Sequence, residues 1–178
     1  MAATRRRVLI VDGYNVLRSG SRYRQVTDPD YTDYAFNYAR DRLVNDVVIF
    51  AGRTWRATVV FDGGDNAYST GEEERVGGVR VMFSPAGQSA DKVIEKLSHE
   101  ARERQLEVLV VTSDATIQDT VFGLGVDRMS AEGFCRELEA LDTDAKLDAQ
   151  PKVAHKRTVA DRIDGDTLAK LRALRDGK

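Results

Sequence analysis

Short apolar runs typical of buried strands alternate along this chain with stretches of helical periodicity. The first run, Arg7–Asp12, is continuously apolar from Val8 to Val11 and does not alternate with polar residues. Such a run indicates a strand that is buried on both faces. Alternation of strands and helices is the pattern of an α/β domain. We therefore expect an α/β fold with a mostly parallel central sheet.

The same periodicities predict the remaining elements. We expect strands at 57–62, 79–84, 107–112 and 126–129, and helices at 32–51, 89–104, 115–123 and 131–141. Two stretches rich in Gly and polar residues, 13–30 and 63–75, are expected to be loops. Residues 1–141 are expected to form one domain, and residues 142–178 a linker followed by a short basic helix.

An aspartate stands where each of four predicted strands gives way to a loop or helix: Asp12, Asp62, Asp91 and Asp114. The carboxyl ends of parallel strands share one edge of a sheet, where ligands bind. Unit charges about 4 Å apart repel by about 4 kcal/mol at an effective dielectric of 20. The carboxyl groups therefore either stay protonated or are compensated by a cation. All-oxygen ligand sets favour Mg²⁺ or Mn²⁺, which makes metal-assisted phosphate chemistry the leading hypothesis.

Each aspartate also has a purely structural explanation. Asp12 is suited to capping a loop and Asp62 to a β-turn, and Asp91 in the first turn of a helix complements the helix dipole. The functional interpretation rests on four such residues at four strand exits. Asn15, three residues after Asp12, is placed to hydrogen-bond a carboxylate or a bound phosphate.

Basic and hydroxyl side chains flank the acidic positions. Arg18, Arg22 and Arg24, with Tyr14 and Tyr23 interleaved, are suited to gripping phosphates or stacking on bases, although a solvated basic loop explains them equally well. Ser113 precedes Asp114 and supplies a hydroxyl at a strand end. Residues 151–178 hold 8 Lys and Arg against 4 Asp and Glu, while the whole chain has a net charge of −2. A basic tail on an acidic body is weak support for nucleic-acid binding.

Several other classes of protein are excluded. Cys135 is the only cysteine, so there is no internal disulfide and no CxxC site, and we expect a buried thiol. No Ser-His-Asp or Cys-His arrangement is available for a covalent nucleophile. The residue two beyond Asp12 is Tyr14 instead of a second aspartate, which argues against a haloacid-dehalogenase-type phosphatase. The P-loop and dinucleotide-binding glycine signatures are absent. No apolar run approaches the length of a membrane span or signal peptide, so we expect a cytoplasmic protein that does not bind membranes.

Four segments together resemble the YacP-like NYN domain family of the PIN-like nuclease group. They are IVDGYNVL, VVFDGG, FSPAGQSADKVIEKL and VVTSDATIQ, in the family's order and near its spacing. The resemblance implies a three-layer α/β/α sandwich and an acidic metal site at Asp12, Asp62, Asp91 and Asp114, with Asn15 and Ser113 as supporting polar groups. It also implies RNA as the substrate and, as in some members, the ribosome as a partner. The acidic residues Glu72–Glu74 depart from what an RNA-binding rim would favour.

The sequence therefore predicts a Mg²⁺- or Mn²⁺-dependent endoribonuclease. Hydrolysis by water is expected to leave a 5′-phosphate and a 3′-hydroxyl, as the resemblance implies. The alternative is a noncatalytic RNA- or ribosome-binding adaptor that retains the acidic site. Nothing in the sequence fixes the oligomeric state.

Overall fold

A six-stranded sheet with the order β3-β4-β2-β1-β5-β6 forms the centre of the fold. The computed structural model describes residues 7–27, 33–63, 71–117 and 125–149. The strands are β1 (Arg7–Asp12), β2 (Trp55–Phe61), β3 (Glu73–Val76), β4 (Val79–Phe83), β5 (Glu107–Val111) and β6 (Val126–Met129). All neighbouring pairs are parallel except β3 and β4. The predicted mostly parallel α/β sheet is confirmed.

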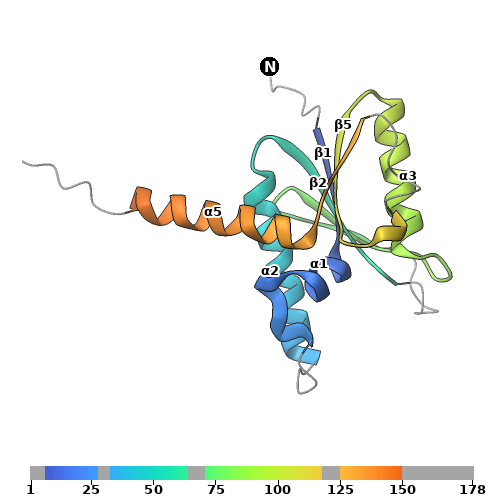
Figure 1. Cartoon of the computed structure of the whole chain (residues 1–178). Helices are drawn as coiled ribbons and strands as arrows, with labels where there is room; N and C mark the ends of the chain where they lie inside the picture. Colours follow the sequence, from blue (N-terminus) through green and yellow to red (C-terminus); the bar gives the residue numbers. More distant parts are fainter. Residues whose placement is uncertain (1–6, 28–32, 64–70, 118–124, 150–178) are drawn as a thin grey trace, which may run out of the picture. The chain divides into compact units, whose positions relative to one another are not determined.

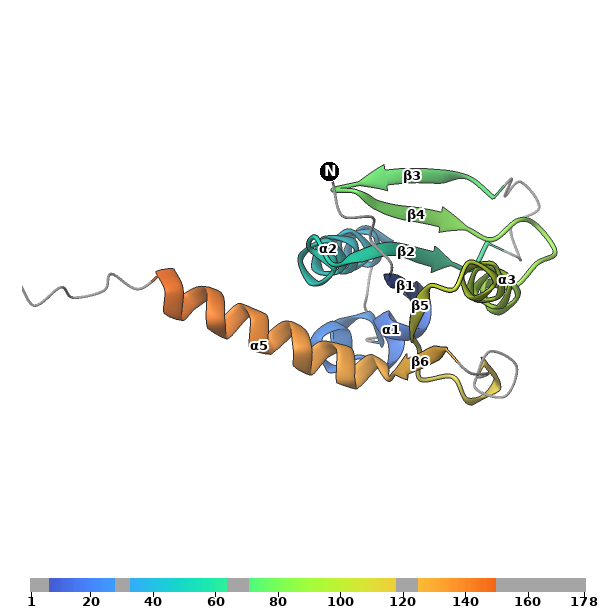
Figure 2. The ribbon, with the colours of Figure 1, turned by 90° about the horizontal axis from the view of Figure 1, so that it is seen from above.

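Helices cover both faces of the sheet, which gives the three-layer arrangement (Figures 1 and 2). They are α1 (Gly13–Ser19), α2 (Asp33–Ala51), α3 (Ala90–Glu103) and α5 (Ala131–Ala149), with a 3-10 segment η1 (Ser21–Thr27). Successive residues of a strand point to opposite faces, so β1 contributes Ile10 to the core beneath α3. Leu9 and Val11 join the other core, beneath α1 and α2. In the described part of the chain no helix combines the length and apolarity needed to cross a membrane.

The stretch predicted as a loop after the first strand is helical. Asp12 caps α1 by accepting a hydrogen bond from the Asn15 backbone N–H at 3.2 Å, and aspartate is a preferred N-cap residue. Val16 and Leu17 are fully buried against the sheet, so packing stabilises this short helix. The prediction of a loop was wrong because it relied on the glycines and serines around this segment, and the apolar face formed by Val16 and Leu17 is short.

The second predicted loop contains the edge strand β3. A two-residue turn of Gly77 (φ +55°) and Gly78 (φ +85°) joins β3 to β4. Both angles are in the left-handed region that hairpin turns of this length require and that glycine adopts readily. Charged side chains are common on edge strands, and Glu73 pairs with Arg80 across the hairpin with Nε and Oε2 at 2.7 Å. The polar composition that suggested a loop therefore belongs to a sheet edge.

Helix α5 continues past its predicted end at Leu141 to Ala149. Thr143 donates its hydroxyl to the Glu139 carbonyl at 2.9 Å, and the added turns contain neither Gly nor Pro. The sequence lacked a signal because Leu147 is exposed and no apolar stripe continues. One compact unit ends at Thr143 and another begins at Asp144. The predicted short basic helix and most of the predicted helix at 115–123 lie outside the described residues.

Gly13 lets the Phe61 ring pack directly against the backbone at the start of α1. A Cβ atom at Gly13 would lie 2.3 Å from Phe61 Cε1. We expect Gly13→Ala to lower the free energy of unfolding by about 1–3 kcal/mol through overpacking, measured by urea denaturation. Gly133→Ala is the control, because Gly133 is also helical and outside the left-handed region, but a Cβ atom there would come no closer than 3.1 Å to another atom. Equal losses in the two variants would show that the contact with the Phe61 ring does not explain the effect.

Candidate functional site

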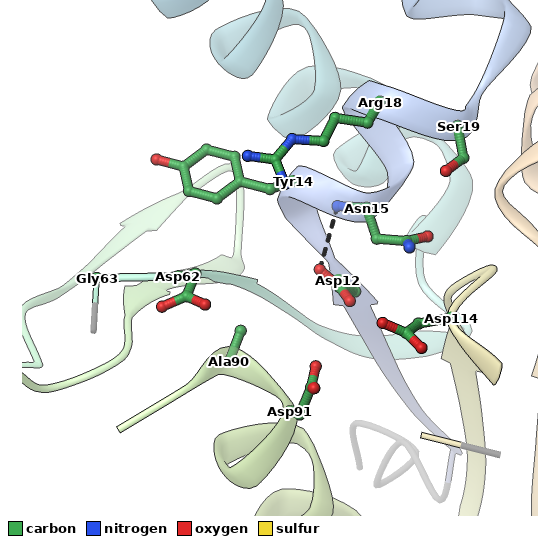
Figure 3. Close-up of a pocket in the computed structure, with 10 residues that line it drawn as sticks. All are labelled: Asp12, Tyr14, Asn15, Arg18, Ser19, Asp62, Gly63, Ala90, Asp91 and Asp114. Atoms are coloured by element: carbon green, nitrogen blue, oxygen red, sulfur yellow. Dashed lines mark hydrogen bonds between the residues drawn. The ribbon is translucent and has the colours of Figure 1, made fainter. Parts of the chain in front are cut away.

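The carboxyl ends of four strands bring the predicted aspartates to one cleft of about 630 Å³. Figure 3 shows the four carboxyl groups around this space, with Tyr14 and Arg18 on the side of α1. The sheet order reverses between β1 and β5, because the chain adds strands first on one side of β1 and then on the other. Such a reversal leaves a crevice at the carboxyl ends of the strands. The cleft is lined by Asp12, Tyr14, Asn15, Arg18, Ser19, Asp62, Gly63, Ala90, Asp91 and Asp114.

Asp12 is the buried carboxylate of the cleft, with 6% of its surface exposed. It ends β1 and accepts hydrogen bonds from the Asn15 backbone N–H and from the Thr112 hydroxyl, the latter at 3.3 Å. Burial, with smaller contributions from the negative charges of Asp91 and Asp114, raises the pKa of Asp12 to about 6 despite the lowering effect of these hydrogen bonds. Asp12 is therefore both held in place and electrostatically unfavourable as an anion.

Thr112 links the ends of β1 and β5. Its hydroxyl donates to Asp12 and accepts from the Asp114 backbone N–H at 3.1 Å. Asp114 in turn accepts hydrogen bonds from the Thr116 hydroxyl and, at 2.8 Å, from the Thr116 backbone N–H. These bonds hold the pKa of Asp114 below its usual value, so this carboxylate is ionised at neutral pH.

Asp62 and Asp91 complete the cleft from β2 and α3. Asp62 accepts a hydrogen bond from the hydroxyl of buried Ser84 at 3.3 Å, and the same hydroxyl oxygen accepts from the Gly63 backbone N–H. Asp91 lies in the first turn of α3, behind the N-cap Ser89. Partial burial and the charges of Asp114 and Asp62 raise the pKa of Asp91. The four carboxylates therefore act on one another electrostatically.

The residues present are compatible with a hydrated divalent ion. Among the described residues, no three His, Cys, Asp or Glu side chains are arranged to hold a metal ion as they stand. Mg²⁺ usually keeps several waters and takes only one or two carboxylates, so a complete protein cage is not needed. Burial first, and then repulsion from the neighbouring carboxylates, raises the pKa values of Asp12 and Asp91, and a nearby cation would stabilise both ionised groups. The donor set fits such an ion through two of its aspartates and water.

The other predicted site residues divide into two pairs. Asn15 and Arg18 line the cleft. Asn15 also accepts a hydrogen bond from the Ser113 backbone N–H at 2.7 Å, which ties α1 to the end of β5.

Arg22 and Ser113 are not among the residues that line the cleft. Arg22 is turned into the protein, where it pairs with Asp46 at 2.9 Å and with Asp142 at 2.8 Å. The hydroxyl of Ser113 accepts from the Ala131 backbone N–H at the start of α5. Both side chains are committed to internal contacts, so the structure does not support the prediction that they bind substrate.

Two supporting residues were missed in the sequence. Ser84 follows β4 directly, as Asp62 follows β2, and the parallel pairing of Phe61 with Phe83 places them together. The position of Ser84 directly after a predicted strand was therefore a signal by which it could have been identified as a site residue. Thr116, which orients Asp114, carries no comparable signal, because its role depends on the local turn after β5.

Comparison with known proteins identifies relatives over most of the chain. The profile of the YacP-like NYN domain matches residues 9–176. The chain is 31% identical over 136 residues to the uncharacterized protein YacP of Bacillus subtilis (strain 168), covering 76% of each chain. The crystal structure of Rae1 (YacP) from Bacillus subtilis has a TM-score of 0.64 and 26% identity, covering 96% of this chain and 95% of that one. A tryptophan-to-leucine mutant of the same Bacillus subtilis protein gives a TM-score of 0.62 at 26% identity, covering 94% and 99% of the two chains.

Proposed function

Because the chain belongs to the YacP-like NYN domain family, we propose that it is a metal-dependent endoribonuclease that hydrolyses RNA with Mg²⁺ or Mn²⁺. The family has the PIN-like nuclease fold, which supports a nuclease-type hydrolase. The single observation that carries the finer proposal is the cleft at the carboxyl edge of the sheet, where all four strand-exit aspartates meet. Carboxylates in a cleft would repel the phosphates of RNA, so a cation is required for this site to accept that substrate.

The four aspartates would have different roles in metal binding, which depend on their surroundings. Asp12 and Asp114, joined through Thr112, would hold the ion, with Asp62 and Asp91 facing the same cleft. When bound, the ion supplies a water of lowered pKa and offsets negative charge on the phosphate oxygens. Thr112 and Thr116 keep the carboxylates oriented without charge of their own. Arg18 at the rim would contact an RNA phosphate.

The test is cleavage of single-stranded RNA by the purified protein with Mn²⁺ or Mg²⁺. We expect products with a 5′-phosphate and a 3′-hydroxyl, loss of cleavage in EDTA and its return when the ion is added back. Asp127→Asn is the matched control, since Asp127 is an exposed aspartate on β6 outside this cleft. Absence of cleavage together with absence of metal uptake in calorimetry would refute the proposal.

A noncatalytic adaptor for RNA or the ribosome is the alternative, favoured by the absence of a ready three-ligand metal set among the described residues. It predicts RNA binding without turnover under every metal condition. We extend the nuclease proposal to mRNA on translating ribosomes in the cytoplasm, which rests on the family resemblance alone. Cleavage that occurs only with ribosomes present would support that extension, and equal cleavage of free RNA would contradict it.

A further inference from the structure

An aromatic and basic ledge borders the acidic cleft on the side of α1 and α2. It consists of Tyr14, Arg18, Arg40 and Phe83, which are connected through the buried ring of Phe61. Tyr14 and Arg18 line the cleft itself, as Figure 3 shows. The ledge thus begins where the proposed chemistry takes place and continues towards α2.

The Tyr14 ring is supported from behind by two other rings. Its centroid lies 5.1 Å from that of Phe61 and 5.5 Å from that of Phe36. Phe61 is fully buried, while Tyr14 is only partly buried and reaches the cleft. A ring fixed on one side and open on another is a platform on which a flat group can stack, because its orientation is already fixed before binding.

Two guanidinium groups accompany the rings. Arg18 lies 5.9 Å from the Tyr14 centroid, and Arg40 lies 5.3 Å from that of Phe83. Within the part of the chain that the structure describes, neither of them forms an ion pair, whereas Arg22 is engaged by Asp46 and Asp142. Arginines that have no carboxylate partner among the described residues and that lie beside partly exposed rings match the phosphates and bases of a single strand.

We propose that an RNA base next to the scissile phosphate stacks on Tyr14 and that the strand leaves the cleft over Arg18 and Arg40. This inference rests on the proposed function, since it names how the RNA lies at that same site. The exposed residues Glu72–Glu74 adjoin the Phe83 end of the ledge, because the Phe83 backbone N–H donates to the Glu72 carbonyl at 3.1 Å. Charge therefore favours a path for the phosphates along Arg18 and Arg40, and not along the glutamates of the neighbouring β3 edge.

Stacking is tested by a double-mutant cycle between the ring and the base. The protein carries Asp114→Asn so that RNA is not cut, and binding is measured by fluorescence anisotropy with Mg²⁺. The probes are labelled single-stranded oligoribonucleotides with one abasic nucleotide at successive positions. We expect Tyr14→Leu to weaken binding of intact RNA by about 5- to 100-fold. At one position of the abasic nucleotide, the loss of affinity for the protein with native Tyr14 should equal the loss caused by Tyr14→Leu with intact RNA. Combining that abasic RNA with Tyr14→Leu should weaken binding little further.

Additive losses at every position would overturn the inference, since a ring with only a structural role would not be coupled to one base. Tyr14→Phe should retain the coupling, because it keeps the ring, and this variant separates stacking from loss of packing. Tyr38→Leu is the matched control, as Tyr38 on α2 is 64% exposed. Cleavage by the protein with native Asp114 and Tyr14 is measured separately. Coupling between Tyr14 and a base in a protein that does not cleave RNA would contradict only the proposed function. RNA cleavage without such coupling would contradict only the proposed stacking on the ledge.

Discussion

Asp12→Asn is expected to abolish RNA cleavage and, without divalent ions, to make the fold more stable. Loss of a residue that only supports a metal ligand costs about 10- to 100-fold, so loss of a ligand should lower the rate by more than about 100-fold. The variant should nevertheless fold, because Asn is as good an N-cap as Asp and its amide oxygen can replace the Oδ1 atom that accepts from the Asn15 backbone N–H. The measurements are the cleavage rate with Mn²⁺ and urea denaturation in EDTA.

The gain in stability follows from the raised pKa of Asp12. Burial raises its pKa to about 6 in the folded protein, against 3.8 in the unfolded chain. The folded state therefore binds the proton more tightly, and ionising Asp12 in the fold costs about 3 kcal/mol at about 1.4 kcal/mol per pKa unit. This cost is fully present above pH 6 and disappears as the pH falls to the unfolded value. The advantage of Asp12→Asn should thus be large at pH 7 and nearly absent at pH 4.

Mg²⁺ should reverse the order of stability. A ligand that binds only the folded state stabilises it by mass action, so added Mg²⁺ should raise the unfolding midpoint of the unmodified protein more than that of Asp12→Asn. Asp127→Asn is again the control and should follow the unmodified protein. If Asp12→Asn were less stable than the unmodified protein at pH 7 in EDTA, Asp12 would not be the strained anion that its burial indicates.

The central strands and the acidic cleft were predictable because both follow from local sequence. The run from Val8 to Val11 is apolar throughout, and the register of β1 with β2 and β5 places the ends of these strands at one edge. Aspartates directly after such strands must then lie near one another, as Asp12, Asp62 and Asp114 do. Asp91 was predictable for the related reason that α3 begins shortly after β4.

The role of Arg22 was not predictable, because its partners are distant in the sequence. Asp46 is 24 residues away and Asp142 is 120 residues away, and neither spacing corresponds to a local motif. An arginine beside a tyrosine has the same local sequence whether it faces RNA or an internal carboxylate. The strand β3, in contrast, carried a usable signal in the Gly77–Gly78 pair between two valines, but its glutamates suggested a loop.

Asp46→Ala is expected to lower the free energy of unfolding strongly. Asp46 is 5% exposed and accepts from Arg22 Nε at 2.9 Å, from Arg22 Nη2 at 3.1 Å and from the Tyr23 hydroxyl at 2.5 Å. Removing it leaves the Arg22 guanidinium, only 13% exposed, without its main partner. Breaking a buried ion pair in this way costs about 3–5 kcal/mol, which thermal or urea unfolding should detect.

Asp142→Ala supplies the matched control for this network. Asp142 is the second partner of Arg22, but its side chain is 42% exposed, so its loss should cost less than about 1 kcal/mol. Adding Arg22→Met to Asp46→Ala should restore much of the lost stability, because an apolar replacement removes the unpaired charge. If the double variant were no more stable than Asp46→Ala, the loss would come from the Tyr23 hydroxyl or from the cavity. An unpaired Arg22 would then not be its cause.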